Sequence, residues 1–214
     1  MPSLLHLDSS IDRVSSRSRA ITASFADAWR ARGPEFTVVH RDLAADPVPH
    51  LSDPALHWAP RLRSADAAPS PEAEAVQQRV LDELLAADAL LIGAPMYNYS
   101  MPSTLKAWVD HIHVPGVTAP FDTDTQPLAG RPAVVVTSRG AVYDPGTATE
   151  HWDHAVPPLE IVLGSALGMR VTVIATNLTL ARTVPALAGS VERSDAELAA
   201  AISRAAELGA TLAV

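Results

Sequence analysis

The chain has 214 residues, of which 48% are hydrophobic, which is enough to bury the core of one domain covering residues 1–214. The formal net charge is −8 and no run of basic residues occurs, so nucleic acid and anionic membranes are excluded as partners and small molecules are favoured. Cysteine is absent, which excludes disulfides, thiolate metal sites and cysteine nucleophiles. Neither a signal-peptide pattern nor an apolar run long enough to span a bilayer is found, so we expect a soluble, cytoplasmic protein.

Apolar runs alternate with helical patterns along the whole chain. Strands are predicted at residues 3–8, 35–43, 89–95, 132–140 and 170–178, and helices at 17–32, 70–88, 103–113, 149–167 and 194–212. Ser70 and Pro71 suit the N-cap and first position of the second helix, whereas residues 45–70 show no period and predict a long surface excursion. The strands are unbroken apolar runs, as in a parallel sheet covered on both faces. Five such units predict a doubly wound α/β fold with a flavodoxin-like sheet of order 2-1-3-4-5.

The segment after the first strand, residues 9–18, is rich in serine. In this strand order the first, third and fourth strands are central, and their carboxyl ends open onto one crevice. Five serines and Arg17 stand there directly before a helix, although a single serine would suffice as a helix cap. Helix N–H groups, hydroxyls and a guanidinium together suit a phosphate monoester. The glycine patterns that cradle pyrophosphates are missing from this segment, which favours a terminal monophosphate.

The segments after the third and fourth strands are also unusual. "MYNYSMPS" at 96–103 offers aromatic faces and backbone amides, which suit a planar heterocycle such as isoalloxazine. A single tyrosine there would be read as core, but the cluster favours a ligand. "SRGAVY" at 138–143 would meet the same crevice.

Taken together, "SS…SxS", "APMYNY…PSTLKAWVDHI…PGVT" and "TSRG" resemble the FMN-dependent NADH-azoreductase family, a flavodoxin-like group also described as quinone reductases. The resemblance covers nearly the whole chain. It implies a homodimer that binds one FMN per chain, takes hydride from NAD(P)H and reduces azo compounds or quinones with ping-pong kinetics. It implies no catalytic side chain, because the flavin carries the chemistry. The cofactor-binding residues that it implies are Ser10, Ser16, Arg17, Ser18, Met96, Tyr97, Asn98, Tyr99, Ser138, Arg139 and Gly140.

Two departures from the family pattern fall in the expected substrate pocket. Ala141 stands where the family usually has a second glycine, and its Cβ either crowds the backbone or narrows the approach to the ring. Phe121 comes later than the usual aromatic residue, behind Pro120. With Trp58 of the excursion, Phe121 and Ala141 are our candidates for the pocket, which we expect to be altered.

Other functions have less support in the sequence. His111 and His113 point to different faces of a helix, and His151 and His154 lack a carboxylate at ligand spacing, so we predict no metal site. "GxSxG" is absent, which leaves a hydrolase without support. The alternatives that stay open are an FMN-binding electron carrier or sensor without an organic substrate, which does not need the 45–70 excursion, and a flavin-free enzyme on the same fold.

Overall fold

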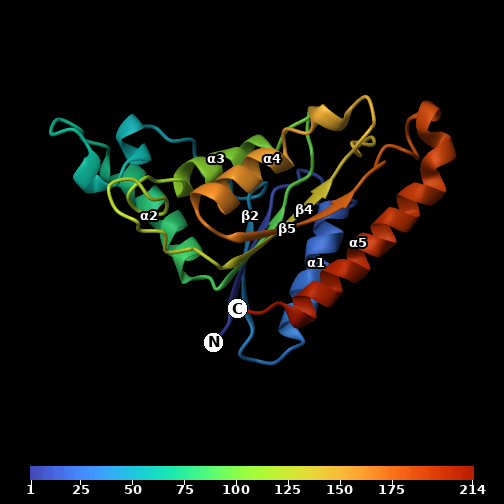
Figure 1. The fold of residues 1–214 in the computed structure, drawn as a ribbon, viewed down its shortest axis with the longest axis horizontal. Helices are drawn as coiled ribbons and strands as arrows, with labels where there is room; N and C mark the ends of the chain where they lie inside the picture. Colours follow the sequence, from blue (N-terminus) through green and yellow to red (C-terminus); the bar gives the residue numbers. More distant parts are fainter.

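The computed structural model describes residues 1–214 and contains one five-stranded parallel sheet of order β2-β1-β3-β4-β5 (Figure 1). The strands are β1 (Ser3–Asp8), β2 (Thr37–Asp42), β3 (Ala89–Gly93), β4 (Pro132–Ser138) and β5 (Arg170–Thr176). Every residue of β3 and β4 is buried, which explains their unbroken apolar sequences. The predicted flavodoxin-like order is confirmed, and it brings the carboxyl ends of β1, β3 and β4 together.

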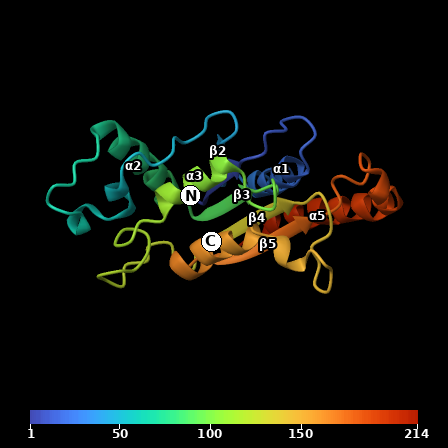
Figure 2. The same ribbon diagram turned by 90° about the horizontal axis from the view of Figure 1, so that it is seen from above.

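Helices cover both faces of the sheet (Figures 1 and 2). On one face lie α1 (Arg17–Arg30) and α5 (Val191–Thr211), whose side chains share a core with Leu4, Leu91 and Ile174. On the other lie α2 (Pro71–Ala86), α3 (Ser103–Ile112) and α4 (Val156–Leu159), which pack on Leu5 and Ile92. The central strands β1, β3 and β4 therefore divide their side chains between two hydrophobic cores.

The predicted helix at 149–167 is broken into three pieces. A 3-10 turn at Glu150–Trp152 is followed by α4 and then by a π-helix, Glu160–Ala166. Pro157 and Pro158 lack N–H groups, so a helix can begin at this point but cannot run through it. The predicted cap of α2 is confirmed, since the Ser70 Oγ accepts a hydrogen bond from the Ala73 N–H at 3.2 Å.

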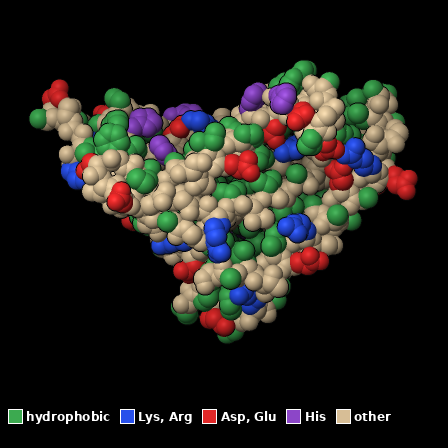
Figure 3. All heavy atoms as spheres, in the orientation of Figure 1, with side chains coloured by type: hydrophobic (Ala, Val, Ile, Leu, Met, Phe, Trp, Pro, Cys, Tyr) green, Lys and Arg blue, Asp and Glu red, His purple; other side chains and the backbone are tan.

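The excursion after β2 carries two short 3-10 helices, Pro54–His57 and Pro60–Leu62. It is tied to the body of the protein by Gln77, whose Nε2 donates to the Leu56 carbonyl at 2.7 Å, and by a 2.8 Å bond between His111 Nε2 and the Pro49 carbonyl. Figures 1 and 2 place this excursion at one end of the molecule and the segment after β4 at the other. Figure 3 shows two groups of histidine side chains along the upper edge of the molecule.

Candidate functional site

The start of α1 gathers hydrogen-bond donors. Ser16 is the N-cap, and its Oγ accepts from the Arg19 N–H at 3.3 Å and lies 3.0 Å from the Oγ of the buried Ser18. The N–H groups of Arg17 and Ser18 are in the first helical turn, where no intrahelical acceptor exists. Two hydroxyls and the free N–H groups of a helix terminus therefore meet at one point, as a phosphate requires.

The guanidinium of Arg17 points away from this point. Its Nη2 donates to the Ser194 Oγ at 2.8 Å, and its Nη1 donates to the backbone carbonyls of Ser194 and Asn177 at 3.2 and 3.4 Å. Arg13 is the other arginine of the loop; its side chain is 65% exposed, and its Nε lies 3.5 Å from the Asp42 Oδ2.

Tyr97 joins the first loop to the second. Its hydroxyl oxygen accepts a hydrogen bond from the Ile11 N–H at 3.0 Å and lies 3.1 Å from the Ser10 Oγ. The next residues, Asn98 and Tyr99, have φ values of 49° and 70°, a region that side chains disfavour and that is found mostly where structure serves a function.

The turn at Asn98 and Tyr99 leaves backbone donors free. Tyr97 and Ser100 exchange two backbone hydrogen bonds, of 2.8 and 3.1 Å, which close a turn around the two residues between them. The N–H groups of Asn98 and Tyr99 donate to nothing within the chain and are available to a ligand. Half of the Tyr99 side chain is exposed, and its ring meets Trp152 edge-on at 5.6 Å.

The third loop, after β4, adjoins the second. The Met96 N–H donates to the Ser138 carbonyl at 2.9 Å, so the predicted convergence of the three loops holds in the structure. The side chain of Arg139 is 12% exposed, and its Nη2 pairs with the Asp153 Oδ2 at 2.5 Å. The other oxygen of Asp153 accepts from the N–H groups of Ala155 and Val156, and so holds the start of α4.

Ala141 does not lie at positive φ. Of the two effects expected from its methyl group, backbone crowding is therefore absent, and what remains is the space that the Cβ occupies. The neighbouring Gly140 is tighter, because a Cβ there would lie 2.8 Å from the Cδ1 of Leu180.

The structure does not bring Trp58 and Phe121 to Ala141 within one chain. The two aromatic rings meet edge-on at 5.0 Å, and 63% of Phe121 is exposed. They belong to the 45–70 excursion and the 115–130 segment, which lie at the opposite end of the molecule from the segment after β4 (Figures 1 and 2). A pocket containing all three residues needs a second chain.

Sequence reasoning missed one cluster altogether. His6, Asp8 and His40 lie within 4.8 Å of one another through their ligand atoms, on the sheet face under α1. The signal was present in the sequence: His6 and Asp8 are two apart on one strand, and the pairing of β1 with β2 puts His40 directly beside His6.

These features define a class of protein, the doubly wound parallel α/β proteins that bind a ligand where the strands end. Here a helix N-terminus suited to a phosphate lies beside a turn that has free N–H groups and aromatic side chains. The model of a family described as having a flavodoxin-like fold matches residues 2–208. No helix reaches the length and apolar character that crossing a membrane requires.

Curated relatives agree over almost the whole chain. A protein of Kineococcus radiotolerans named FMN-dependent NADH:quinone oxidoreductase is 57% identical over 212 residues, covering 99% of this chain and 100% of the relative. A protein of the same name from Streptomyces coelicolor is 42% identical and covers 97% of this chain and 96% of the relative. The chain belongs to the flavodoxin-like fold family and, within it, to the family of these oxidoreductases.

Solved structures support the same fold. An azoreductase from Bacillus anthracis superposes with a TM-score of 0.80 at 18% identity, covering 98% of this chain and 99% of that one. An FMN-dependent NADH-azoreductase from the same species, solved in complex with FMN, gives a TM-score of 0.77 at 19% identity, with coverage of 98% and 100%.

Proposed function

We propose that this protein is an FMN-dependent oxidoreductase that transfers electrons from NADH to quinones. The 57% identity to a curated FMN-dependent NADH:quinone oxidoreductase over the full length carries this conclusion. The structure supports it through the Tyr97 hydroxyl, which links the loop that suits a phosphate to the loop that suits a flat ring. The name of that relative, an FMN-dependent oxidoreductase, favours an enzyme over an electron carrier or a flavin-free protein.

The chain's own groups fit the two ends of FMN. The hydroxyls of Ser10, Ser16 and Ser18 would hold the phosphate with the N–H groups at the start of α1. Arg17 would contribute its backbone N–H, because its guanidinium is already bonded to Ser194. A phosphate brings acceptors only, and this loop supplies donors.

The ring would lie against the second and third loops. Met96, Tyr97, Asn98 and Tyr99 would supply apolar contact and the two free N–H groups of the turn, and Ser138, Arg139 and Gly140 would border its polar edge. FMN held there would supply two-electron chemistry, hydride transfer from NADH and then to the acceptor, with donor and acceptor using one slot in turn. The residues around it orient the ring and exclude water, so no side chain has to act as a nucleophile. The positive charge of Arg139 stays fixed by Asp153.

The site would be completed by a second copy of the chain. We infer a homodimer because Phe121 and Trp58 expose aromatic surface at an end of the molecule that its own site does not reach. A partner could place this pair over the ring beside Ala141. Sedimentation of the purified protein at nanomolar to micromolar concentration should show a stable dimer. A monomer with full turnover would refute the shared pocket.

A cytoplasmic location stays a prediction.

Reconstitution with FMN tests the function directly. Apoprotein titrated with FMN should bind one per chain, and anaerobic NADH should bleach the bound flavin, whose colour a small quinone should then restore. A Ser16→Ala, Ser18→Ala double variant is the control, because it removes two hydroxyls of the phosphate loop and should weaken FMN binding. Failure to bind FMN, or bleaching that no quinone reverses, would contradict the proposal.

A further inference from the structure

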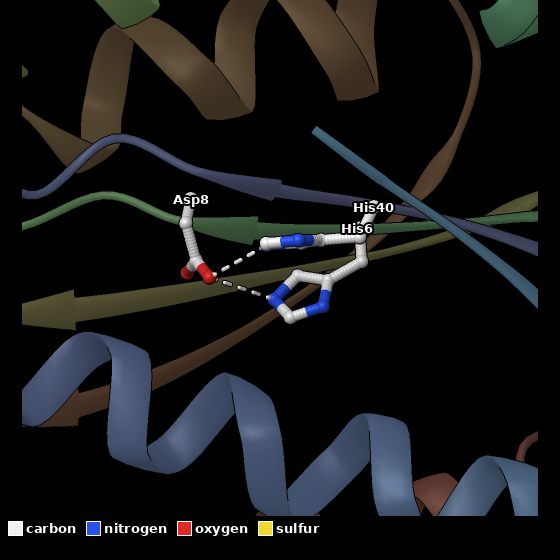
Figure 4. Close-up of side chains that lie close together, drawn as sticks. All are labelled: His6, Asp8 and His40. Atoms are coloured by element: carbon white, nitrogen blue, oxygen red, sulfur yellow. Dashed lines mark hydrogen bonds and ion pairs between the residues drawn. The ribbon is translucent and has the colours of Figure 1, made fainter. Parts of the chain in front are cut away.

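His6, Asp8 and His40 form a compact cluster at the end of β1 and on β2, and none of them is among the residues proposed to hold the cofactor (Figure 4). His6 and Asp8 are two residues apart on β1 and so face the same side of the sheet. His40 is the register partner of His6 on the edge strand β2. The three side chains therefore gather between the sheet and α1.

Both imidazoles point to the same carboxylate oxygen. The Nε2 atoms of His40 and His6 lie 3.0 and 3.4 Å from the Oδ2 of Asp8. The first distance is that of a hydrogen bond and the second is too long for a good one. His6 is only 5% exposed and its Nε2 has no hydrogen-bond partner. A buried nitrogen without a hydrogen-bond partner destabilises the fold unless a ligand binds it. The Nε2 of His6 is therefore free to bind a ligand.

These separations suit ligands of one metal ion. Two ligand atoms about 2.1 Å from a common ion lie about 3.0 Å apart at an octahedral angle and about 3.4 Å apart at a tetrahedral one. The distances from the Asp8 Oδ2 to the Nε2 atoms of His40 and His6, 3.0 and 3.4 Å, fall within the range that two ligand atoms of one ion can span. The side chain of His40 is 43% exposed, which gives an ion and its remaining water ligands a way in from solvent.

A polar neighbour on α1 holds the carboxylate of Asp8 in place. Thr22 donates to the other oxygen, Oδ1, at 2.9 Å, and a Cβ at Gly93 would come within 2.7 Å of that oxygen. The Nη1 of Arg19 lies 3.7 Å from Oδ2 and its Nη2 lies 2.7 Å from the Asp42 Oδ1, so this guanidinium is shared between two carboxylates.

We propose that His6, Asp8 and His40 bind a divalent transition-metal ion such as Zn²⁺, with water completing its coordination. Two imidazole nitrogens and one carboxylate favour zinc, cobalt, nickel or copper over magnesium or calcium, which prefer oxygen ligands. The ion would join the edge strand β2 to β1, and its binding does not depend on the proposed function.

Isothermal titration of the full chain, freed of any affinity tag and treated with EDTA, tests the site. Zinc sulfate should bind saturably at one ion per chain and raise the thermal midpoint, and EDTA should reverse both. Cobalt should give visible ligand-field absorption. In His40→Ala, zinc affinity should fall at least about tenfold, the loss that even outer-shell changes cause at metal sites. His40→Gln repeats the test should the alanine variant unfold.

A matched control is His50→Ala, which removes an exposed histidine outside the cluster and should leave zinc affinity unchanged. Titration of FMN into the same variants reports cofactor binding separately, so loss of the metal site and failure of the flavin proposal are distinguishable. Zinc binding that is unsaturable, or equally tight in the wild type and the His40 variants, would overturn the assignment.

Discussion

Tyr97→Phe removes one oxygen atom from the contact that joins two loops of the candidate site. That oxygen accepts from the Ile11 N–H at 3.0 Å and lies 3.1 Å from the Ser10 Oγ. A neutral hydrogen bond contributes about 0.5–1.5 kcal/mol, so the two together contribute about 1–3 kcal/mol. Because Ile11 is exposed, we expect the lower part of that range, about 1–2 kcal/mol.

The lost energy should appear mainly as weaker cofactor binding. Without the Tyr97 hydroxyl, the Ser10 loop has to be ordered by the cofactor itself, and that cost is subtracted from the binding free energy. An increase in the FMN dissociation constant of about 5- to 30-fold corresponds to 1–2 kcal/mol. Flavin fluorescence measured while apoprotein is titrated gives this constant. Far-UV circular dichroism checks that the variant is folded.

Tyr143→Phe is the matched control, since Tyr143 follows β4 but its hydroxyl bonds neither Ser10 nor Ile11. We expect its FMN affinity to equal that of the wild type. If Tyr97→Phe also binds FMN as tightly as the wild type, the two loops do not act together on the cofactor, and the argument from their contact fails.

Three further predictions separate the roles of other residues. Ser16→Ala should raise the FMN dissociation constant about tenfold. Arg17→Ala should change it less than about threefold, because the guanidinium of Arg17 bonds Ser194. Equal losses of affinity in a fluorescence titration would show that this guanidinium contacts FMN. Ala141→Gly should raise the ratio of azo to quinone kcat/KM by about 10, since one methyl in a pocket is worth about 1–3 kcal/mol, with parallel double-reciprocal plots in both proteins; an unchanged ratio would place residue 141 outside the slot. Burial lowers the pKa of His111, against the raising effect of the Pro49 carbonyl, so below about pH 6.5 the unfolded chain binds a proton that the folded chain does not. The free energy of unfolding should therefore decrease as the pH falls from 6.5 towards the folded pKa, and denaturant melts of His111→Gln should lack that slope.

The sequence predicts most of the fold because the central strands β3 and β4 are apolar runs that are buried along their whole length. β1 begins and ends at the predicted residues 3 and 8, and the cap of α2 is visible in Ser70 and Pro71. The break in the predicted helix at 149–167 was readable in principle from Pro157 and Pro158, but a π-helix depends on packing that no local pattern encodes.

The candidate site is predictable only to the level of its loops. The topology places Ser10, Met96 and Ser138 at one edge of the sheet, as the strand order requires. Side-chain direction is a different matter, because the direction of the Arg17 guanidinium depends on Ser194, far along the chain. The register of β2 against β1, which brings His40 to His6, likewise had to be seen in the structure.

The two residues after Arg139 show how acceptor preference can change without cost to the fold. At Gly140 an added Cβ would meet the end of the Leu180 side chain, which is 46% exposed and has to shift to admit it. At Ala141 the backbone does not occupy the region that requires glycine, so a methyl group there is free of strain. The size of the side chain at position 140 is therefore limited by Leu180, and the size at position 141 by the ligand that faces it. If residue 141 faces the acceptor slot over the flavin ring, its methyl group narrows access for bulky, twisted acceptors more than for flat ones, while the cofactor loops keep their geometry.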